Sequence, residues 1–229
     1  MEILYQNDQL VVVDKPAGML VHKTGIASDV KTGFALQTVR DMIGKKVFPV
    51  HRLDRPTSGV LLFALDPLSA KNIAIQFTER TIIKEYICVV RGYTDDEGII
   101  DIPLSKENGS MVDAKTSYSL IRRFQLPIPN DRFETSRYSI VRVKPESGRM
   151  HQIRRHFAKK RWYLIGDTTH GNLKANRAFG NFTGINRLLL HAEKINLNHP
   201  ITQEKIYVCA PWPHRFVQLN ELILKQSAV

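Results

Sequence analysis

The chain is patterned as short apolar runs separated by turn residues, and this pattern predicts more strands than helices. Proline and glycine at residues 14–18 end the first run and mark a turn. Two polar stretches, residues 122–136 and 172–186, are predicted as surface loops. The predicted strands are residues 11–13, 60–65, 82–91, 99–102, 116–121, 138–143, 188–197 and 204–209.

Helical spacing occurs in fewer places. Apolar residues at positions 36, 39 and 43 recur at i, i+3 and i+7, and Gly44 follows them as a typical helix end. Asp66 followed by Pro67 predicts an N-cap and a first helical residue, with an apolar stripe behind them. Further helices are predicted at residues 149–160 and 216–224.

The order of these elements sets the fold class. Strands do not alternate regularly with helices, which argues against a doubly wound parallel sheet. The sequence therefore predicts an α+β fold, with a mixed, largely antiparallel central sheet and flanking helices and loops. No internal repeat or linker divides the 229 residues, so residues 1–229 are predicted to form a single domain.

Charge narrows the class of partner. The formal net charge is +11 and the pI is about 9.7, which favours a polyanion: nucleic acid first, an anionic membrane surface second. Between Pro145 and Ile165, Glu146 is the lone carboxylate among many Lys and Arg residues, and Trp162 and Tyr163 follow the cations directly. Cations beside aromatic rings suit phosphate contacts and base stacking.

Other classes are disfavoured. No apolar stretch approaches the roughly 20 residues of a membrane span, and the first residues do not resemble a signal peptide. Cys88 and Cys209 both lie in apolar, strand-like runs, so they are predicted as buried free thiols in a reducing cytoplasm. The sequence lacks a P-loop, a dinucleotide turn and a metal-ligand set, and His151 and His156 are spaced wrongly for a shared helix face. We therefore predict no cofactor and no metal.

Asp54 is the first candidate for chemistry. It lies in a Gly- and Pro-containing segment, residues 51–59, between two apolar runs, with Arg52 before it and Arg55 after it. Nearby cations favour the ionised form, which a carboxylate nucleophile or base requires. Taken alone, the segment fits turn chemistry with a surface ion pair better than it fits a catalytic role.

Two further side chains are candidates on local pattern. On the predicted helix, Arg154 lies at the edge of the apolar face, where a half-buried arginine seeks a carboxylate, whereas Arg155 points outward to solvent or phosphate. Arg154 could instead extend its stem along the core edge. Tyr86 starts a predicted strand and could stack on a flat ring, or simply fill the core.

These segments occur together, in order, over nearly the whole chain. They are residues 14–18 with 21–22, 51–59, 84–86, 147–154, 166–167 and 187–192. The set resembles the successive motifs of the RluA-type pseudouridine synthases, and the segment His-Arg-Leu-Asp with its Thr-Ser-Gly tail is highly specific. The resemblance implies the catalytic fold of that family. It also implies that the protein is an isomerase, which converts uridine in RNA to pseudouridine without a cofactor or a metal.

The resemblance also implies roles. Asp54 matches the catalytic aspartate, and Arg154 matches the arginine that pairs with it. Tyr86 matches the tyrosine that stacks on the target base, while Leu188, with Leu190 as the alternative, matches an apolar pocket residue. The carboxylate would act as a nucleophile on the ribose or base, or as the base that starts glycosidic elimination.

A target uridine inside an RNA helix must be flipped out, and Arg52 matches the residue that enters the vacated space. Within the family, the chain most resembles the subgroup that modifies uridine 65 of tRNA and lacks a preceding RNA-binding domain of the S4 type. The resemblance thus implies a cytoplasmic monomer that acts on tRNA without a membrane or a required protein partner. The alternatives are ribosomal RNA as substrate, a non-catalytic RNA-binding or chaperone protein of the same fold and, more distantly, a metal-dependent nuclease.

Overall fold

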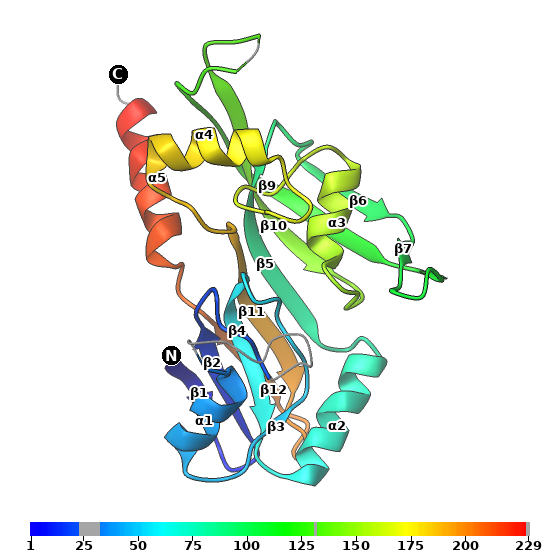
Figure 1. Cartoon of the computed structure of the whole chain (residues 1–229). Coiled ribbons are helices and arrows are strands. Elements are labelled where there is room, and N and C mark those ends of the chain that lie inside the picture. The colour runs from blue at the N-terminus through cyan, green and yellow to red at the C-terminus, as the bar shows by residue number, and fades with distance from the viewer. Residues whose placement is uncertain (23–32, 131, 228–229) are drawn as a thin grey trace. The chain divides into compact units, whose positions relative to one another are not determined.

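The computed structural model describes residues 1–22, 33–130 and 132–227 (Figure 1). The chain packs into two compact units, each built from two stretches of sequence. Unit 1 contains Met1–Lys84 and Ala192–Pro211, and unit 2 contains Glu85–His191 and Trp212–Val229. Whether the two act together as a single catalytic domain stays a prediction.

Unit 1 is built on a sheet whose strands run in the order β1-β2-β4-β11, with β3 paired to β4 and β12 to β11. The pairs β1–β2, β2–β4, β3–β4 and β11–β12 are antiparallel. Its strands are β1 (Glu2–Gln6), β2 (Leu10–Lys15), β3 (Phe48–Pro49), β4 (Ser58–Ala64), most of β11 (Leu190–Asn198) and β12 (Lys205–Cys209).

Two helices pack in unit 1, α1 (Ala35–Ile43) and α2 (Pro67–Thr78) (Figure 1). Helix α1 ends, and helix α2 begins, where the sequence predicts. Asp66 accepts a hydrogen bond from the Ser69 backbone N–H at 2.8 Å, which confirms the predicted N-cap. Gly44 has φ 72° and closes α1 as predicted. The core beneath is aliphatic and includes Val12 and Leu62 from the sheet.

Unit 2 holds an antiparallel sheet in the order β5-β10-β9-β6, together with a separate β7–β8 hairpin. Its strands are β5 (Ile83–Arg91), β6 (Glu97–Asp101), β7 (Leu104–Ser105), β8 (Met111–Val112), β9 (Lys115–Leu126) and β10 (Ser136–Pro145). The largely antiparallel α+β fold predicted from the sequence is confirmed.

Helices cover both faces of this sheet: α3 (Gln152–Lys159), α4 (Leu173–Thr183) and α5 (His214–Ser227). Successive strand residues face opposite sides, and β5 shows this directly. Ile87 belongs to the cluster that contains Phe179 of α4 and Phe216 of α5. Cys88 belongs to the cluster that contains Phe157 of α3. Unit 2 therefore has two cores, one on each side of its sheet.

The loop predicted at residues 122–136 is too long, because β9 continues to Leu126. Arg123 and Gln125 are exposed, whereas Phe124 and Leu126 are buried in the core. The polar residues therefore form the solvent face of a strand with a two-residue period, and the loop is confined to the residues between β9 and β10.

The loop predicted at residues 172–186 is wrong, because α4 occupies most of it. The polar and glycine residues that indicated a loop are the helix caps. Asn172 accepts a hydrogen bond from the Ala175 N–H at 2.9 Å, and Gly184 ends the helix with φ 72°.

Two smaller expectations also need correction. Helix α3 begins at Gln152 rather than at residue 149, because His151 has φ 52° and ψ 29°, a left-handed conformation that cannot continue a helix. Cys209 is an exposed free thiol, not a buried one, because β12 alternates exposed and buried positions. Cys88 is buried as predicted, and burial raises its pKa above the usual range.

Candidate functional site

The candidate carboxylate Asp54 lies in unit 1, on the loop that joins β3 to β4. The loop is tied to the turn that follows β2. The Gly18 N–H donates to the Arg55 carbonyl at 2.8 Å, and Arg55 Nε donates back to the Gly18 carbonyl at 3.0 Å. The Thr57 N–H closes a turn onto the Asp54 carbonyl at 3.0 Å. The backbone that directly follows Asp54 is therefore fixed by the residue 14–18 segment.

Lys15 strengthens this attachment from inside the core. Its side chain is fully buried, and its ammonium donates to the carbonyls of Pro16 and Met19, both at 2.9 Å, and of Arg55 at 3.3 Å. Several hydrogen bonds are what a buried ammonium needs to offset its lost hydration. The sequence identified this segment only as a motif, and the structure gives Lys15 the task of supporting the Asp54 loop.

Gly59, the last residue of the segment 51–59, permits a close approach between strands β4 and β11. Its φ is +110°, and a Cβ built on it would lie 2.1 Å from the Ala192 carbonyl oxygen. No other residue type fits there without movement of the backbone. This contact fixes the start of β4, and so the far end of the Asp54 loop, against β11.

His51 anchors the near end of the loop. Its Nε2 accepts a hydrogen bond from the Leu62 N–H at 2.9 Å, and its ring centroid lies 5.2 Å from that of Phe77. Burial and the positive charge of Lys84 lower the pKa of His51 from 6.5 to about 3. His51 is therefore a neutral structural acceptor at physiological pH.

The low pKa of His51 predicts a pH-dependent stability. Between pH 3 and pH 6.5 the unfolded chain binds more protons at His51 than the folded chain, so the free energy of unfolding rises with pH in this window and levels off above it. Since His51 as a residue is only partly buried, we expect a discounted effect of about 1–2 kcal/mol between pH 4.5 and 7. The measurement is urea unfolding of the wild type and of His51→Gln, whose amide oxygen can accept the Leu62 N–H without titrating. Identical pH slopes for the two proteins would contradict this role.

Arg52 is exposed on the same loop of unit 1. The remaining candidates from the sequence, Tyr86, Arg154 and Leu188, lie in unit 2. Asp54 and Arg52 are thus presented together by one short loop, and the other three belong to one packed body.

Within unit 2, Arg154 forms a buried, bidentate ion pair with Asp167. Arg154 Nε lies 2.7 Å from Asp167 Oδ2, and Arg154 Nη2 lies 2.8 Å from Asp167 Oδ1. The side chain of Arg154 is 3% exposed and that of Asp167 is 1% exposed. Arg154 is therefore more deeply buried than the half-buried position that was predicted for it at the edge of the helix face. A guanidinium has five N–H donors, more than Asp167 uses, so this pair is compatible with a second carboxylate partner.

Asp167 is held in the ionised state by its surroundings. Burial raises its pKa, but the hydrogen bonds and charge of Arg154 and the backbone N–H groups of His170 and Thr169 outweigh it, so that the pKa lies below its usual value. Both N–H groups reach Oδ1 at 2.9 Å. The sequence singled out Asp167 as part of a motif but gave it no role.

Asn176 of α4 fixes the backbone on which Asp167 sits. Its Oδ1 accepts from the Gly166 N–H at 3.0 Å, and its Nδ2 donates to the Asp167 carbonyl at 2.9 Å. Gly166 has φ +77°, and a Cβ there would lie 1.9 Å from the Arg187 carbonyl oxygen. Asn176 was missed as a site residue because its segment was predicted as a loop.

A histidine pair lies beside these residues. His151 Nδ1 and His170 Nε2 are 2.9 Å apart, and the rings meet edge to face. Burial lowers the pKa of His170, and the charge of Asp167 opposes this shift. The two rings and the Arg154–Asp167 pair therefore connect the start of α3 to the segment before α4.

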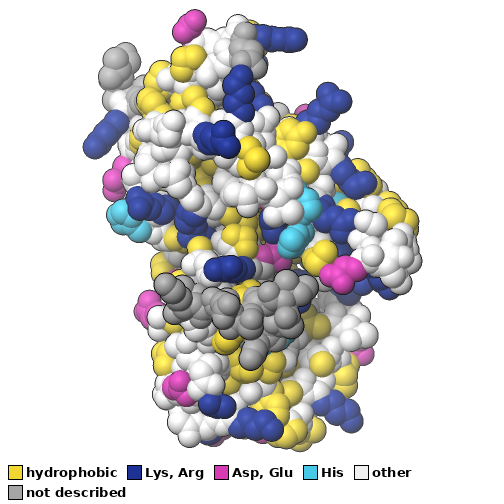
Figure 2. All heavy atoms as spheres, in the orientation of Figure 1, with side chains coloured by type: hydrophobic (Ala, Val, Ile, Leu, Met, Phe, Trp, Pro, Cys, Tyr) yellow, Lys and Arg dark blue, Asp and Glu magenta, His cyan; other side chains and the backbone are white. Residues whose placement is uncertain are grey.

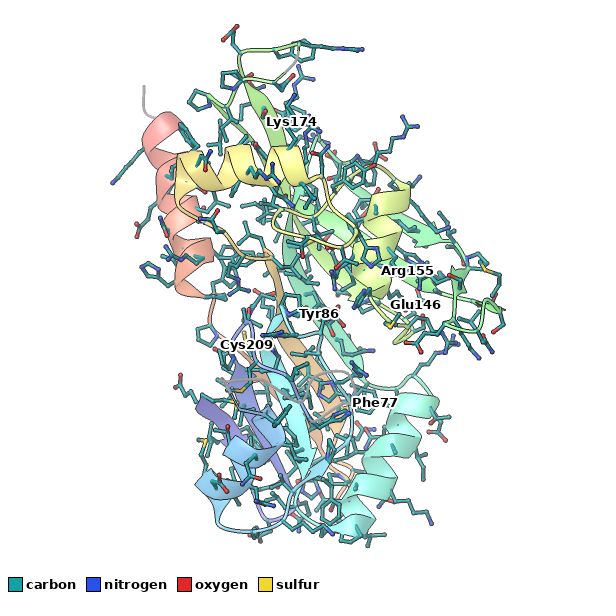
Figure 3. The ribbon with its side chains drawn as sticks, in the orientation of Figure 1. Phe77, Tyr86, Glu146, Arg155, Lys174 and Cys209 are labelled. Carbon is teal, nitrogen blue, oxygen red and sulfur yellow. The ribbon has the colours of Figure 1, made fainter. Side chains whose placement is uncertain are left out.

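Tyr86, Leu188 and Leu190 contribute to one apolar cluster of unit 2. Leu188 is 2% exposed and Leu190 is 3% exposed, and both belong to the core that carries Ile153 of α3. Tyr86, labelled in Figure 3, lies on β5 and packs against this cluster while remaining partly exposed. Both leucines are equally buried, so burial does not separate them as pocket residues.

Arg155 faces away from the core of α3, but it also binds protein. Its Nη1 donates to the Ser105 carbonyl at 3.0 Å and its Nη2 to the Ser105 hydroxyl at 2.7 Å. Figure 3 shows Arg155 on α3. Arg149 similarly donates to the Asp113 carbonyl at 3.2 Å. Part of the basic segment therefore secures the β7–β8 hairpin and the chain after it.

No group of three or more His, Cys, Asp or Glu side chains in residues 1–22, 33–130 and 132–227 is arranged to hold a metal ion. None of the helices in that part of the chain is long and apolar enough to cross a membrane.

Two curated proteins that are similar to this chain over most of its length have the same name. The tRNA pseudouridine synthase C of Pasteurella multocida (strain Pm70) is 43% identical over 230 residues, which cover 96% of this chain and 94% of the relative. The tRNA pseudouridine synthase C of Yersinia pestis is 44% identical over 223 residues, which cover 93% and 86%.

Solved structures show the same fold. Human RNA pseudouridylate synthase domain containing 1 matches with a TM-score of 0.73 and 23% identity, covering 93% of this chain and 83% of that one. Human RNA pseudouridylate synthase domain containing 4 matches with a TM-score of 0.73 and 22% identity, covering 97% and 92%. The family model described as RNA pseudouridylate synthase matches residues 9–159. The chain belongs to the RNA pseudouridylate synthase family.

Proposed function

We propose that this chain isomerises uridine 65 of tRNA, in the acceptor and T-stem region, to pseudouridine, with Asp54 as the catalytic carboxylate. The observation that carries the tRNA assignment is the likeness, at 43% identity over 96% of the chain, to a protein named tRNA pseudouridine synthase C. The basic composition, with a net charge of +11, agrees with an RNA substrate.

The reaction conserves every heavy atom of the nucleotide. The N1–C1′ glycosidic bond breaks, the base turns within the site, and a C5–C1′ bond forms. C5 loses its proton to solvent and N1 gains one, so the step needs no oxidant, reductant or energy source. An enzyme for it must supply a carboxylate, a surface on which the base can turn, and the means to extract the nucleotide.

Asp54 supplies the carboxylate, as a nucleophile on the ribose or base, or as the base that starts glycosidic elimination. Its loop is suited to the task, because Lys15 and Gly18 fix the adjacent Arg55 carbonyl at 3.3 and 2.8 Å. A fixed backbone limits the orientations open to the carboxylate, which is how an enzyme lowers the entropic part of a barrier.

Arg154 pairs with Asp54 in this proposal and orients its carboxylate. The bidentate contact with Asp167, at 2.7 and 2.8 Å, would hold the guanidinium in one plane while its other donors meet Asp54. Tyr86 stacks on the target base, with Leu188 lining the apolar wall beside it.

In this proposal Arg52 acts before the chemical step, when the target nucleotide is flipped out of the RNA helix. Flipping a base out of an RNA helix costs a few kcal/mol in lost stacking and pairing. The guanidinium of Arg52, exposed on the loop that carries Asp54, would enter the vacated space and recover part of that loss by stacking. The chain would act as a monomer, without a protein partner.

Mapping of pseudouridines in total RNA, from cells with and without this gene product, tests the substrate. We expect the signal at position 65 of tRNA to disappear without the protein and to return with the wild-type gene but not with Asp54→Asn. Loss of a signal from ribosomal RNA instead would keep the chemistry and overturn the tRNA assignment. No change at any uridine would overturn the function itself.

A further inference from the structure

Helix α3 starts from a residue in an unusual backbone conformation. His151, its N-cap, has φ 52° and ψ 29°, whereas the N-caps of α1, α2 and α4 are extended. An extended N-cap is usual, and the left-handed conformation is strained for a residue with a Cβ. Among the described residues, three other non-glycine residues have positive φ, and none of them starts a helix: Arg80, Arg161 and Gln203. The surroundings of His151 must therefore hold it in place, because such strain persists only where the structure determines it.

His170 provides a contact that holds His151. Its Nε2 lies 2.9 Å from His151 Nδ1, and the two rings meet at 73°. One ring must donate and the other accept, so the hydrogen bond fixes the orientation of both. Both residues are partly exposed, and Figure 2 shows histidine side chains, in cyan, at the surface of unit 2 in the region of α3. Glycine at position 151 would adopt the same backbone without strain, but it could not make this contact.

The backbone of His170 is held by the carboxylate that also holds Arg154. The His170 N–H donates to Asp167 Oδ1 at 2.9 Å, and Arg154 Nε donates to Asp167 Oδ2 at 2.7 Å. Arg154 follows His151 by three residues, in the first turn of α3. The contacts thus close into a ring of four residues: Asp167, His170, His151 and Arg154. Arg154 is fixed at both ends, through its guanidinium and through the start of its helix.

We propose that His170 is a positioning residue for the reaction: by holding His151, it sets the direction in which α3 presents Arg154. The inference rests on the proposed function, in which Arg154 orients the carboxylate of Asp54. Asp167 fixes the guanidinium, whereas the start of α3 fixes the Cα from which the side chain extends. Both are needed to keep the remaining N–H donors directed at a second carboxylate. We therefore expect the chemical step, rather than the affinity for RNA, to depend on His170.

The test compares two substitutions of one side chain. His170→Phe keeps a flat ring without a hydrogen-bonding nitrogen, and we expect it to lower kcat for tritium release from C5-labelled tRNA by about ten-fold, with KM within about two-fold of wild type. His170→Gln should recover most of the loss, because its amide can bond to His151. The second readout is the ¹H–¹⁵N resonance of Arg154 Nε in the RNA-free protein, identified by its absence from Arg154→Lys. It should move in His170→Phe and stay in place in His170→Gln.

Two further variants control the comparison. His214→Phe replaces an exposed histidine at the start of α5 and should change neither kcat nor the Arg154 resonance. The double variant His151→Ala/His170→Phe should have a kcat within about two-fold of His151→Ala alone, because either change removes the same contact.

Three results would overturn the inference: a His170→Phe protein with wild-type kcat, a lower melting temperature with an unmoved Arg154 resonance, which indicates a structural role alone, or fully additive losses of kcat in the double variant. Failure of the wild type to release tritium would instead overturn the proposed function. The Arg154 resonance would still show whether His170 sets the direction of Arg154.

Discussion

Asp54→Asn is expected to lower tritium release from C5-labelled tRNA by at least about 1000-fold, because the amide can serve neither as a nucleophile nor as a base. RNA affinity and its salt dependence should stay close to wild type, since the substitution preserves the shape of the side chain. Single-turnover assays with enzyme in excess separate the chemical step from binding.

Asp54→Ala should be equally inactive, and Asp8→Asn, which changes an exposed carboxylate elsewhere in unit 1, should retain full activity. Circular dichroism and thermal melting check that the Asp54 variants fold. Turnover of either Asp54 variant at the wild-type rate would remove Asp54 from the catalytic role.

Arg154→Lys is expected to lower kcat/KM by about 100-fold or more and to lower the free energy of unfolding by about 3 kcal/mol. A point charge replaces a planar group that makes two parallel hydrogen bonds to Asp167 at 2.7 and 2.8 Å. If Arg154 also orients Asp54, the loss of kcat at saturating RNA should exceed what partial unfolding explains. Steady-state kinetics and urea unfolding at the same temperature give both quantities.

Arg155→Lys is the neighbouring control. Arg155 contacts Ser105 at the surface, so its replacement should leave kcat within a few-fold of wild type. Equal losses of kcat in the two variants would show that Arg154 has no special part in the reaction. A stable Arg154→Lys protein with wild-type kcat would contradict the pairing with Asp54.

Much of the fold could be predicted because the signals are local. The cap at Asp66, the glycine end of α1 at Gly44 and the apolar runs of β4 and β5 each require only adjacent residues. The errors arose where one residue type serves two purposes. Asn172 and Gly184 resemble loop residues but cap α4, and Arg123 and Gln125 resemble a loop but form the outer face of β9.

The site was predicted only in part for a related reason. Asp54 and Arg154 are identifiable from motifs, but the contacts that support them depend on distant segments. Asp167 follows Arg154 by 13 residues across an intervening turn, and Asn176 reaches back from α4 to the backbone of Gly166 and Asp167. No periodicity in the sequence relates these positions, so only the folded chain brings them together.

The most direct measurement of the central claim is tritium release by the purified wild-type chain from two tRNA transcripts labelled at C5 of uridine. One transcript has the natural uridine at position 65, and the other has cytidine there with its pairing partner changed to match. The account predicts release approaching one tritium per molecule of the first transcript and none from the second. No release from the first transcript, or equal release from both, would contradict it.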